Sequence, residues 1–94
     1  MSAYLVGQIH VRDSALWAQY VAGVAASLEM YAAEIVFRGT RVRDLAGTQP
    51  HELAVVIRFP DLDELQRWYA SDAYQALVAL RERAADVRLT AYEG

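Results

Sequence analysis

The stretch LAVVIRFPDLDELQRWY, residues 53–69, contains the pattern that decides the fold. From Leu53 to Phe59 every second residue is a large apolar one, which is the period of a strand that buries one face. Pro60 cannot donate a hydrogen bond to a neighbouring strand and therefore ends this one. Asp61, with Glu64 three residues later, predicts that a helix begins at once. A strand followed directly by a helix is one half of an α+β unit.

The residues before this stretch predict the same order of elements. Tyr4 to Val11 is rich in β-branched and aromatic residues that alternate between two faces, which is typical of a strand. Asp13 can cap a helix that we expect from Ser14 to Tyr31. The apolar residues of that helix recur at steps of three and four and form one stripe. They are Trp17, Tyr20, Val21, Val24, Leu28 and Tyr31.

Shorter segments complete the pattern. Ile35–Phe37 predicts a second strand that turns at Gly39, and Arg41–Leu45 is either its continuation or a short partner strand. Ala46–Pro50 has the composition of a turn. Val87–Tyr92 alternates again and predicts the last strand.

The second helical region is predicted in two segments. Ser71 or Asp72 interrupts the helix that begins at Asp61 and caps the next segment. That segment has its apolar side on Tyr74, Leu77, Val78 and Leu80. The resulting order is β-α-β-β-α-β, the ferredoxin-like α+β arrangement, in which two helices cover one face of an antiparallel sheet. We expect residues 1–94 to form one such domain.

The opposite face of the predicted sheet indicates a homodimer. It is too apolar in part to be left fully in water, so a second sheet from another copy could cover it. Association also adds burial to a chain of 94 residues, which buries a smaller fraction of its surface than a larger domain does. The residues expected on this face are Val6, Gln8, Ala54, Val56 and Thr90.

Composition excludes several classes of function. The net charge is −3, and all nine basic residues are arginines spread along the chain, without the clustering that nucleic-acid binding needs. The absence of cysteine excludes disulfides and thiolate chemistry. Neither a secretory signal nor a membrane-spanning stretch is present, so we expect a soluble, cytoplasmic protein. No phosphate loop, dinucleotide fingerprint or serine nucleophile motif occurs, and we expect no cofactor.

Several local sequences, taken together, resemble the domain of unknown function 1330 family, whose fold belongs with the dimeric α+β barrels. The stretches that carry the resemblance are AYLV at 3–6, YAAE at 31–34, RGT at 38–40, FP at 59–60, WYASDAYQ at 68–75, and Arg81. Family members usually have paired glycines where this chain has Ala32 and Ala33, and a second glycine where it has Thr40. The resemblance implies the fold and the dimer, and it implies little about chemistry, because related barrels range from monooxygenases and isomerases to non-catalytic proteins.

Two residues are candidates for catalysis. His10 ends the first strand on the face opposite Leu5, where an imidazole could act as a general base or orient an acidic ligand. Its alternative role is that of a polar residue at the dimer interface. Arg38 ends the second strand, and its planar guanidinium could receive a carboxylate, phenolate or enolate. Its alternative role is an ion pair with Glu34 or with a residue of the other subunit.

An aromatic cluster is the candidate substrate-binding site. Trp68, Tyr69 and Tyr74 surround the break in the second helical region, and Tyr31 can approach from the end of the first helix. Arg81 follows Tyr74 by seven residues, hence on nearly the same helical face, where it could supply charge to a pocket. The alternatives are that the aromatic residues are packed core and that Arg81 pairs with Asp86 or Glu29.

The remaining polar residues indicate no further site. His51 lies beside Pro50 in the predicted turn, where we expect it to be solvated. The two histidines lack metal-binding spacing, so neither a metal site nor haem binding has a ligand set. Asp61, Asp63 and Glu64 are explained by helix capping.

Two hypotheses for function follow. The first is a cofactor-independent enzyme that acts on a small aromatic or acidic metabolite bound between helices and sheet. In it, Arg38 or Arg81 holds negative charge, His10 or a tyrosine moves a proton, and aromatic residues exclude water. The alternative is a non-catalytic dimeric ligand-binding or accessory module.

Overall fold

Alternation of strands and helices is the organising feature of the computed structural model, which describes residues 1–94. The order is the predicted β-α-β-β-α-β, with the second helical region divided into three helices. The elements are β1 (Ala3–Val11), α1 (Ser14–Leu28), β2 (Glu34–Thr40), β3 (Leu53–Phe59), α2 (Leu62–Ala70), α3 (Asp72–Gln75), α4 (Val78–Ala84) and β4 (Ala85–Glu93).

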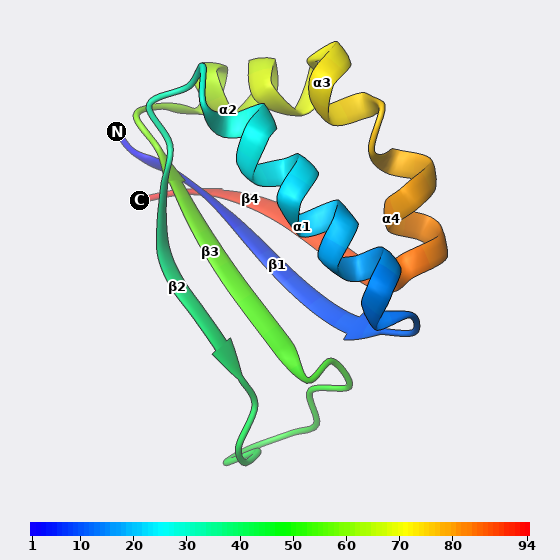
Figure 1. Ribbon diagram of the computed structural model, residues 1–94. Coiled ribbons are helices and arrows are strands. Elements are labelled where there is room, and N and C mark those ends of the chain that lie inside the picture. Colours follow the sequence, from blue (N-terminus) through cyan, green and yellow to red (C-terminus); the bar gives the residue numbers. More distant parts are fainter.

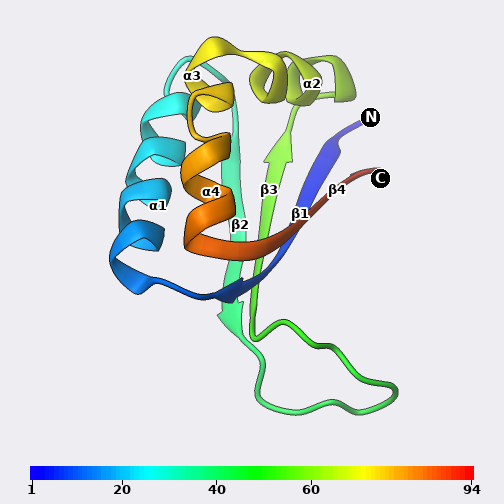
Figure 2. The same ribbon diagram turned by 90° about the vertical axis from the view of Figure 1, so that its right-hand side faces the viewer.

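The four strands form one antiparallel sheet in the order β2-β3-β1-β4. All four helices lie on the same side of this sheet, and the other side carries none (Figures 1 and 2). Helices α1 and α4 lie side by side, with α2 and α3 across one end. This arrangement confirms the predicted ferredoxin-like α+β fold.

The register of β1 decides which residues meet the helices. Leu5 is paired with Ile57 of β3 and with Ala91 of β4, and Ile9 is paired with Leu53 and Val87. These residues face the helices, where Leu5, Ile9 and Ile57 are buried. The alternate residues point to the open face, as predicted. Those expected there were Val6, Gln8, Ala54, Val56 and Thr90, and the register places all five on it.

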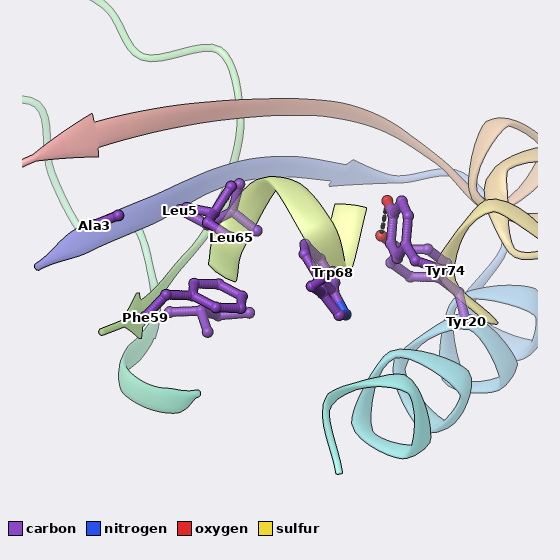
Figure 3. Packing of buried hydrophobic residues seen from close by; sticks show 8 residues of the cluster. Ala3, Leu5, Tyr20, Phe59, Leu65, Trp68 and Tyr74 are labelled. Carbon is purple, nitrogen blue, oxygen red and sulfur yellow. Dashed lines mark hydrogen bonds between the residues drawn. The ribbon is translucent and has the colours of Figure 1, made fainter. Parts of the chain in front are cut away.

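Aromatic side chains fill the space between the sheet and the helices. Trp68, Tyr74 and Phe59 are the largest fully buried side chains. The ring centroids of Trp68 and Tyr74 lie 4.5 Å apart, and those of Trp68 and Phe59 lie 5.5 Å apart. Figure 3 shows these rings in one layer with Leu5 and Leu65. Two of the predicted binding residues, Trp68 and Tyr74, are therefore also packed core.

Helix α1 begins as predicted and ends earlier than predicted. Asp13 accepts a hydrogen bond from the backbone N–H of Leu16, which caps the start of the helix. The end lies at Leu28, not Tyr31. The last N–H groups bond to carbonyls three residues back, with Glu29 donating to Ala26 and Tyr31 donating to Leu28. These bonds tighten the final turn and stop the helix, a local effect that apolar periodicity does not register.

Residues 41–45 form neither a continuation of β2 nor a partner strand. The hydrogen bonds between β2 and β3 end one residue beyond the two strands, where the Arg41 N–H donates to the carbonyl of Glu52. The following residues project away from the sheet, and Val42 and Leu45 are more than nine-tenths exposed. Gly47 has a φ of 71°, a left-handed conformation that suits glycine in the predicted turn. Residues 41–52 are called the β2–β3 loop below.

A β-bulge at Val36 breaks the alternation of β2. Ile35 is paired with Ile57, but the next paired residue, Phe37, is opposite Val56. Because two residues of β2 lie opposite one residue of β3, the β2 residues after the bulge point to the opposite faces from those that an unbroken strand would give them. Phe37 consequently lies on the open face, and Arg38, opposite Val55, lies on the helix face.

Ser71, one of the two residues predicted to interrupt the second helical region, divides α2 from α3. Its Oγ accepts a hydrogen bond from the Tyr74 N–H at 3.2 Å and donates to the Trp68 carbonyl at 2.6 Å. One hydroxyl therefore serves both the end of α2 and the start of α3.

We expect Ser71→Ala to lower the free energy of unfolding by about 1 kcal/mol, because both bonds are lost. Urea denaturation followed by circular dichroism measures the change. Ser14→Ala is the matched control, since Ser14 is exposed at the start of α1. Equal stability of the two variants would contradict the capping role.

Candidate functional site

A cavity of about 430 Å³ lies between α1 and the sheet. Of its 18 lining residues, 15 are hydrophobic. Helix α1 contributes Trp17 and Tyr20 to one wall, and α2 contributes Trp68. Strand β2 contributes Arg38 and Thr40 at the edge of the sheet. A largely apolar cavity of this size with few polar groups is typical of a site for a small organic molecule.

Arg38 is the only charged residue that lines the cavity. The bulge at Val36 places it on the helix face, where an unbroken strand would have put Phe37. The ion pair with Glu34 that sequence allowed does not form, because Glu34 lies on the open face and pairs with Arg58 at 3.4 Å. The Arg38 side chain is exposed at the cavity edge, where its guanidinium can accept an anion.

Beside the cavity, three tyrosines and an arginine form a hydrogen-bonded chain. The hydroxyls of Tyr20 and Tyr74 are 2.8 Å apart, and Figure 3 shows them pointing at each other. Arg81 Nη1 donates to the Tyr74 hydroxyl at 2.9 Å and to the Tyr69 hydroxyl at 3.3 Å. Helix α1 is thereby joined to α2, α3 and α4 through polar atoms in an apolar layer.

The direction of this chain follows from what each group can do. Arginine only donates, so the Tyr74 oxygen accepts from Arg81, while either hydroxyl can be the donor in the bond between Tyr74 and Tyr20. Only the arrangement in which Tyr74 donates to Tyr20 leaves the Tyr20 hydroxyl proton free for another acceptor. Burial, followed by the hydrogen bond to Tyr74, raises the pKa of Tyr20 well above its usual range. Tyr20 is therefore a hydrogen-bond donor near neutral pH and not a general base.

Arg81 makes neither of the ion pairs that sequence allowed. Its Nη2 bonds to Glu82 at 2.9 Å, while Asp86 pairs with His51. Its Nε is buried and has no hydrogen-bond partner. The side chain is oriented toward Tyr69 and Tyr74, as the sequence-based hypothesis requires, although it does not line the cavity.

The other predicted binding residues have different positions. Trp68 lines the cavity with its ring, and its Nε1 donates to Ser27 Oγ at 3.0 Å, so the indole N–H is already used. Tyr69 is partly exposed and packs on Tyr74 with ring centroids 5.0 Å apart. Tyr31 packs against the core from the turn after α1 and does not line the cavity. Their role in binding stays a prediction.

The structure does not bring His10 and Arg38 together. His10 is paired with Asp86 on the open face of the sheet, and Arg38 lies on the helix face. The His10 Nδ1 is 2.9 Å from Glu52 Oε2, and this hydrogen bond lowers the pKa of Glu52 to about 2. A direct catalytic pair of His10 and Arg38 within one chain is excluded by this geometry.

The prediction that His51 is solvated is wrong. It is only 3% exposed, and its Nε2 is 2.8 Å from Asp86 Oδ2. The bond crosses β1, because His51 precedes β3 and Asp86 belongs to β4. A partner 35 residues away cannot be recognised from the local turn composition on which the prediction rested.

Sequence reasoning missed Tyr20 as a site residue. It was read only as one member of the apolar stripe of the first helix. A tyrosine in a buried stripe needs a hydrogen-bond partner for its hydroxyl, and that requirement is the signal that could have singled it out. Thr40, a second cavity residue that was missed, gives no comparable signal.

No group of three or more His, Asp or Glu side chains is close enough to hold a metal ion. The longest helix, α1, has 15 residues, and none of the helices has the length and hydropathy of a membrane span.

Comparison with known proteins identifies a family and a fold. The sequence matches the family described as "Domain of unknown function (DUF1330)" over residues 2–94, which confirms the resemblance. No curated protein sequence matches the chain.

Three solved structures illustrate the fold likeness. A protein of unknown function from Rhodopseudomonas palustris has a TM-score of 0.84 at 16% identity, covering 99% of this chain and 82% of its own. The cofactor-independent oxygenase SnoaB from Streptomyces nogalater has a TM-score of 0.71 at 13% identity, covering 99% and 92%. A dimeric ferredoxin-like protein of unknown function from Jannaschia sp. CCS1 has a TM-score of 0.72 at 8% identity, covering 100% of both chains. At these identities the likeness shows the fold alone.

We expect Tyr74→Phe to lower the free energy of unfolding by about 1 to 3 kcal/mol, because it leaves Tyr20 and Arg81 without their shared partner. Thermal or urea denaturation measures the loss. The matched control is Tyr92→Phe, whose exposed hydroxyl should matter by less than about 0.5 kcal/mol. A Tyr74→Phe protein as stable as the control would show that the chain of hydroxyls contributes nothing.

Proposed function

The chain belongs to the family of domain of unknown function DUF1330, and on that premise we propose that it binds a small aromatic acid or phenol and acts on it without a cofactor. The observation that carries the proposal is the cavity beside α1, with apolar walls and a single charged residue, Arg38. A flat ring that carries an anionic group fits this combination, because the ring would pack against the apolar walls and the anion would bind the Arg38 guanidinium.

The aromatic wall supports a flat ligand. Trp17 and Tyr20 are stacked with ring centroids 5.1 Å apart, and Trp68 lines the same cavity from α2. Aromatic rings pack well against other aromatic rings in offset or edge-on arrangements. A saturated ligand would use the same apolar area with less geometric selectivity.

The protonated Tyr20 hydroxyl supports a reaction in which negative charge develops on a ligand oxygen. With Tyr74 donating to Tyr20 and accepting from Arg81, the Tyr20 proton would be available to a ligand oxygen and held in place before the reaction begins. Preorganised donors of this kind stabilise an oxyanion or enolate in a dry site. SnoaB, which has the same fold, is a cofactor-independent oxygenase, so catalysis without a cofactor is compatible with this architecture.

A second candidate is binding without catalysis. The position of His10 favours it, because the histidine that could serve as a base lies on the opposite face of the sheet from Arg38. With Tyr20 held protonated, the cavity then has hydrogen-bond donors and no general base of its own chain.

Intrinsic fluorescence tests ligand binding directly, because both tryptophans of the chain line the cavity. We expect 1-naphthoate to change the tryptophan emission, and Arg38→Ala to weaken its binding about 10- to 100-fold, the loss of one charge-assisted contact. Neutral 1-naphthamide should bind both proteins equally. Arg67→Ala, on the exposed side of α2, is the charge-matched control.

Absence of any emission change with a panel of aromatic acids and phenols would refute the proposal. If a panel member binds, incubation in air followed by mass spectrometry distinguishes the two candidates. A modified product supports catalysis, and an unchanged ligand supports the binding module.

For the open face of the sheet we propose a second copy of the chain as partner. Val6 and Val56 lie at its centre, and Phe37 is half exposed beside them. The β2–β3 loop, with exposed Val42 and Leu45, bends toward this side of the sheet (Figure 2). Pairing of two such faces would bury these residues, and the description of the Jannaschia protein as dimeric agrees with it.

We expect Val56→Arg to convert a dimer into monomers, because a charge at the centre of an apolar interface loses its water without gaining a partner. Sedimentation velocity over a dilution series measures the shift, and circular dichroism checks the fold. Gln19→Arg, exposed on α1, adds the same charge on the helix side. A monomeric parent protein at every concentration would count against the proposed interface.

A further inference from the structure

Two histidines attach the β2–β3 loop to the far end of the sheet. His51, near the end of the loop, bonds to Asp86 at the start of β4. His10, at the end of β1, bonds to Glu52, which also accepts from the Val11 N–H at 3.1 Å. His10 and Asp86 are themselves paired across β1 and β4, so the two contacts are adjacent. The proposed function uses neither.

The surroundings of His51 indicate its protonation state. Gln49 Oε1 is 3.2 Å from the backbone N of His51, which can only donate, and this identifies the atom as the amide oxygen. The same oxygen is 3.4 Å from His51 Nδ1, and the Asp86 carboxylate is 2.8 Å from Nε2. Both ring nitrogens therefore face acceptors. Only the doubly protonated imidazolium can donate to both.

The carboxylates keep their charge over the range in which histidines change theirs. The His10 hydrogen bond lowers the pKa of Glu52 to about 2, and the His51 hydrogen bond lowers the pKa of Asp86. Their stabilising contribution is present above the usual carboxylate pKa and is lost only as the pH falls through these lowered values. Histidine charge changes between about pH 5 and 8. The two carboxylates therefore stay charged throughout that window.

Other charged groups are near this corner. On β4, Arg88 follows Asp86, and Arg12 comes directly after β1; both act on the Asp86 carboxylate. On the loop, Asp44 accepts from the Gln49 N–H, and Arg41 and Arg43 precede it. These charged groups surround the two histidine contacts.

We propose that His10 and His51 form a pH-sensitive latch that holds the β2–β3 loop against β1 and β4 most firmly when both rings are protonated and more loosely as they lose their protons. Deprotonation leaves each ring with one N–H donor, so His51 can no longer donate to both Gln49 and Asp86. Each histidine also loses its positive charge, so the contacts with Glu52 and Asp86 are no longer ion pairs. The hold is greatest at mildly acidic pH and weakens as the pH rises toward 8.

Loosening of the loop would affect the cavity described above. The loop joins Thr40 at the end of β2 to Leu53 at the start of β3, and both line the cavity. A more loosely held loop weakens one restraint on the edge strand that carries Arg38. The pH would then influence how firmly the cavity edge is held, whatever molecule occupies it.

A spin label in the loop tests the latch in the full chain. The chain has no cysteine, so Thr48→Cys, at an exposed loop position, gives a single labelling site. We expect the label to become severalfold more mobile between pH 5.5 and 8. In the His10→Gln/His51→Gln background, which retains donors but cannot titrate, mobility should not depend on pH. Asp86→Asn, at an exposed position, is the second variant and should raise mobility at pH 5.5.

Three outcomes would overturn the latch. They are equal mobility at both pH values in the parent protein, the same pH response in the double glutamine variant, and no effect of Asp86→Asn. Each measurement is made at two protein concentrations tenfold apart. A response that changes with concentration would assign the histidines to a contact between chains, and would likewise overturn a latch within one chain.

Discussion

Strand β1 is the constraint on which the rest of the structure depends. It is the only strand that is hydrogen-bonded to both β3 and β4, and its register assigns every second residue to the helix face. A slip by one residue would place Leu5 and Ile9 on the open face and unpack the aromatic layer above them. The same alternation separates His10 from the cavity. The alternation of residues between the two faces of β1 thus decides both which side chains fill the core and which polar groups can reach the cavity.

The bulge at Val36 changes that alternation on one edge strand. It turns Phe37 to the open face and brings Arg38 to the helix face, so the apolar cavity acquires its one charged residue. Bulges commonly re-aim side chains near functional sites. Here the same extra residue also leaves an aromatic ring on the face that we assign to a second copy. A single local irregularity therefore contributes to the proposed ligand site and to the proposed interface.

Polar groups in the core are arranged in connected chains. Ser27 satisfies the indole N–H of Trp68, and Tyr74 joins Tyr20 to Arg81. Unpaired polar atoms in such a layer would cost free energy, and only Arg81 Nε lacks a partner. Burial, followed by the hydrogen bond to Tyr74, keeps Tyr20 protonated beside the cavity. The same tyrosine hydroxyls contribute to core stability and to the proposed chemistry. The aromatic cluster therefore has features of a packed core and features of a binding site.

Sequence by itself determined the order of elements, the buried faces of β1, β3 and β4, and the caps at Asp13 and Asp61, because periodicity and capping are local properties. The candidate site was only partly accessible in this way: the sequence proposes Trp68, Tyr74 and Arg81 as binding residues, but it does not give their contacts. The positions of Arg38 and His51 were decided by tertiary structure. A bulge depends on how two strands pair, and the burial of His51 depends on a carboxylate 35 residues away. Local sequence patterns therefore predict neither feature.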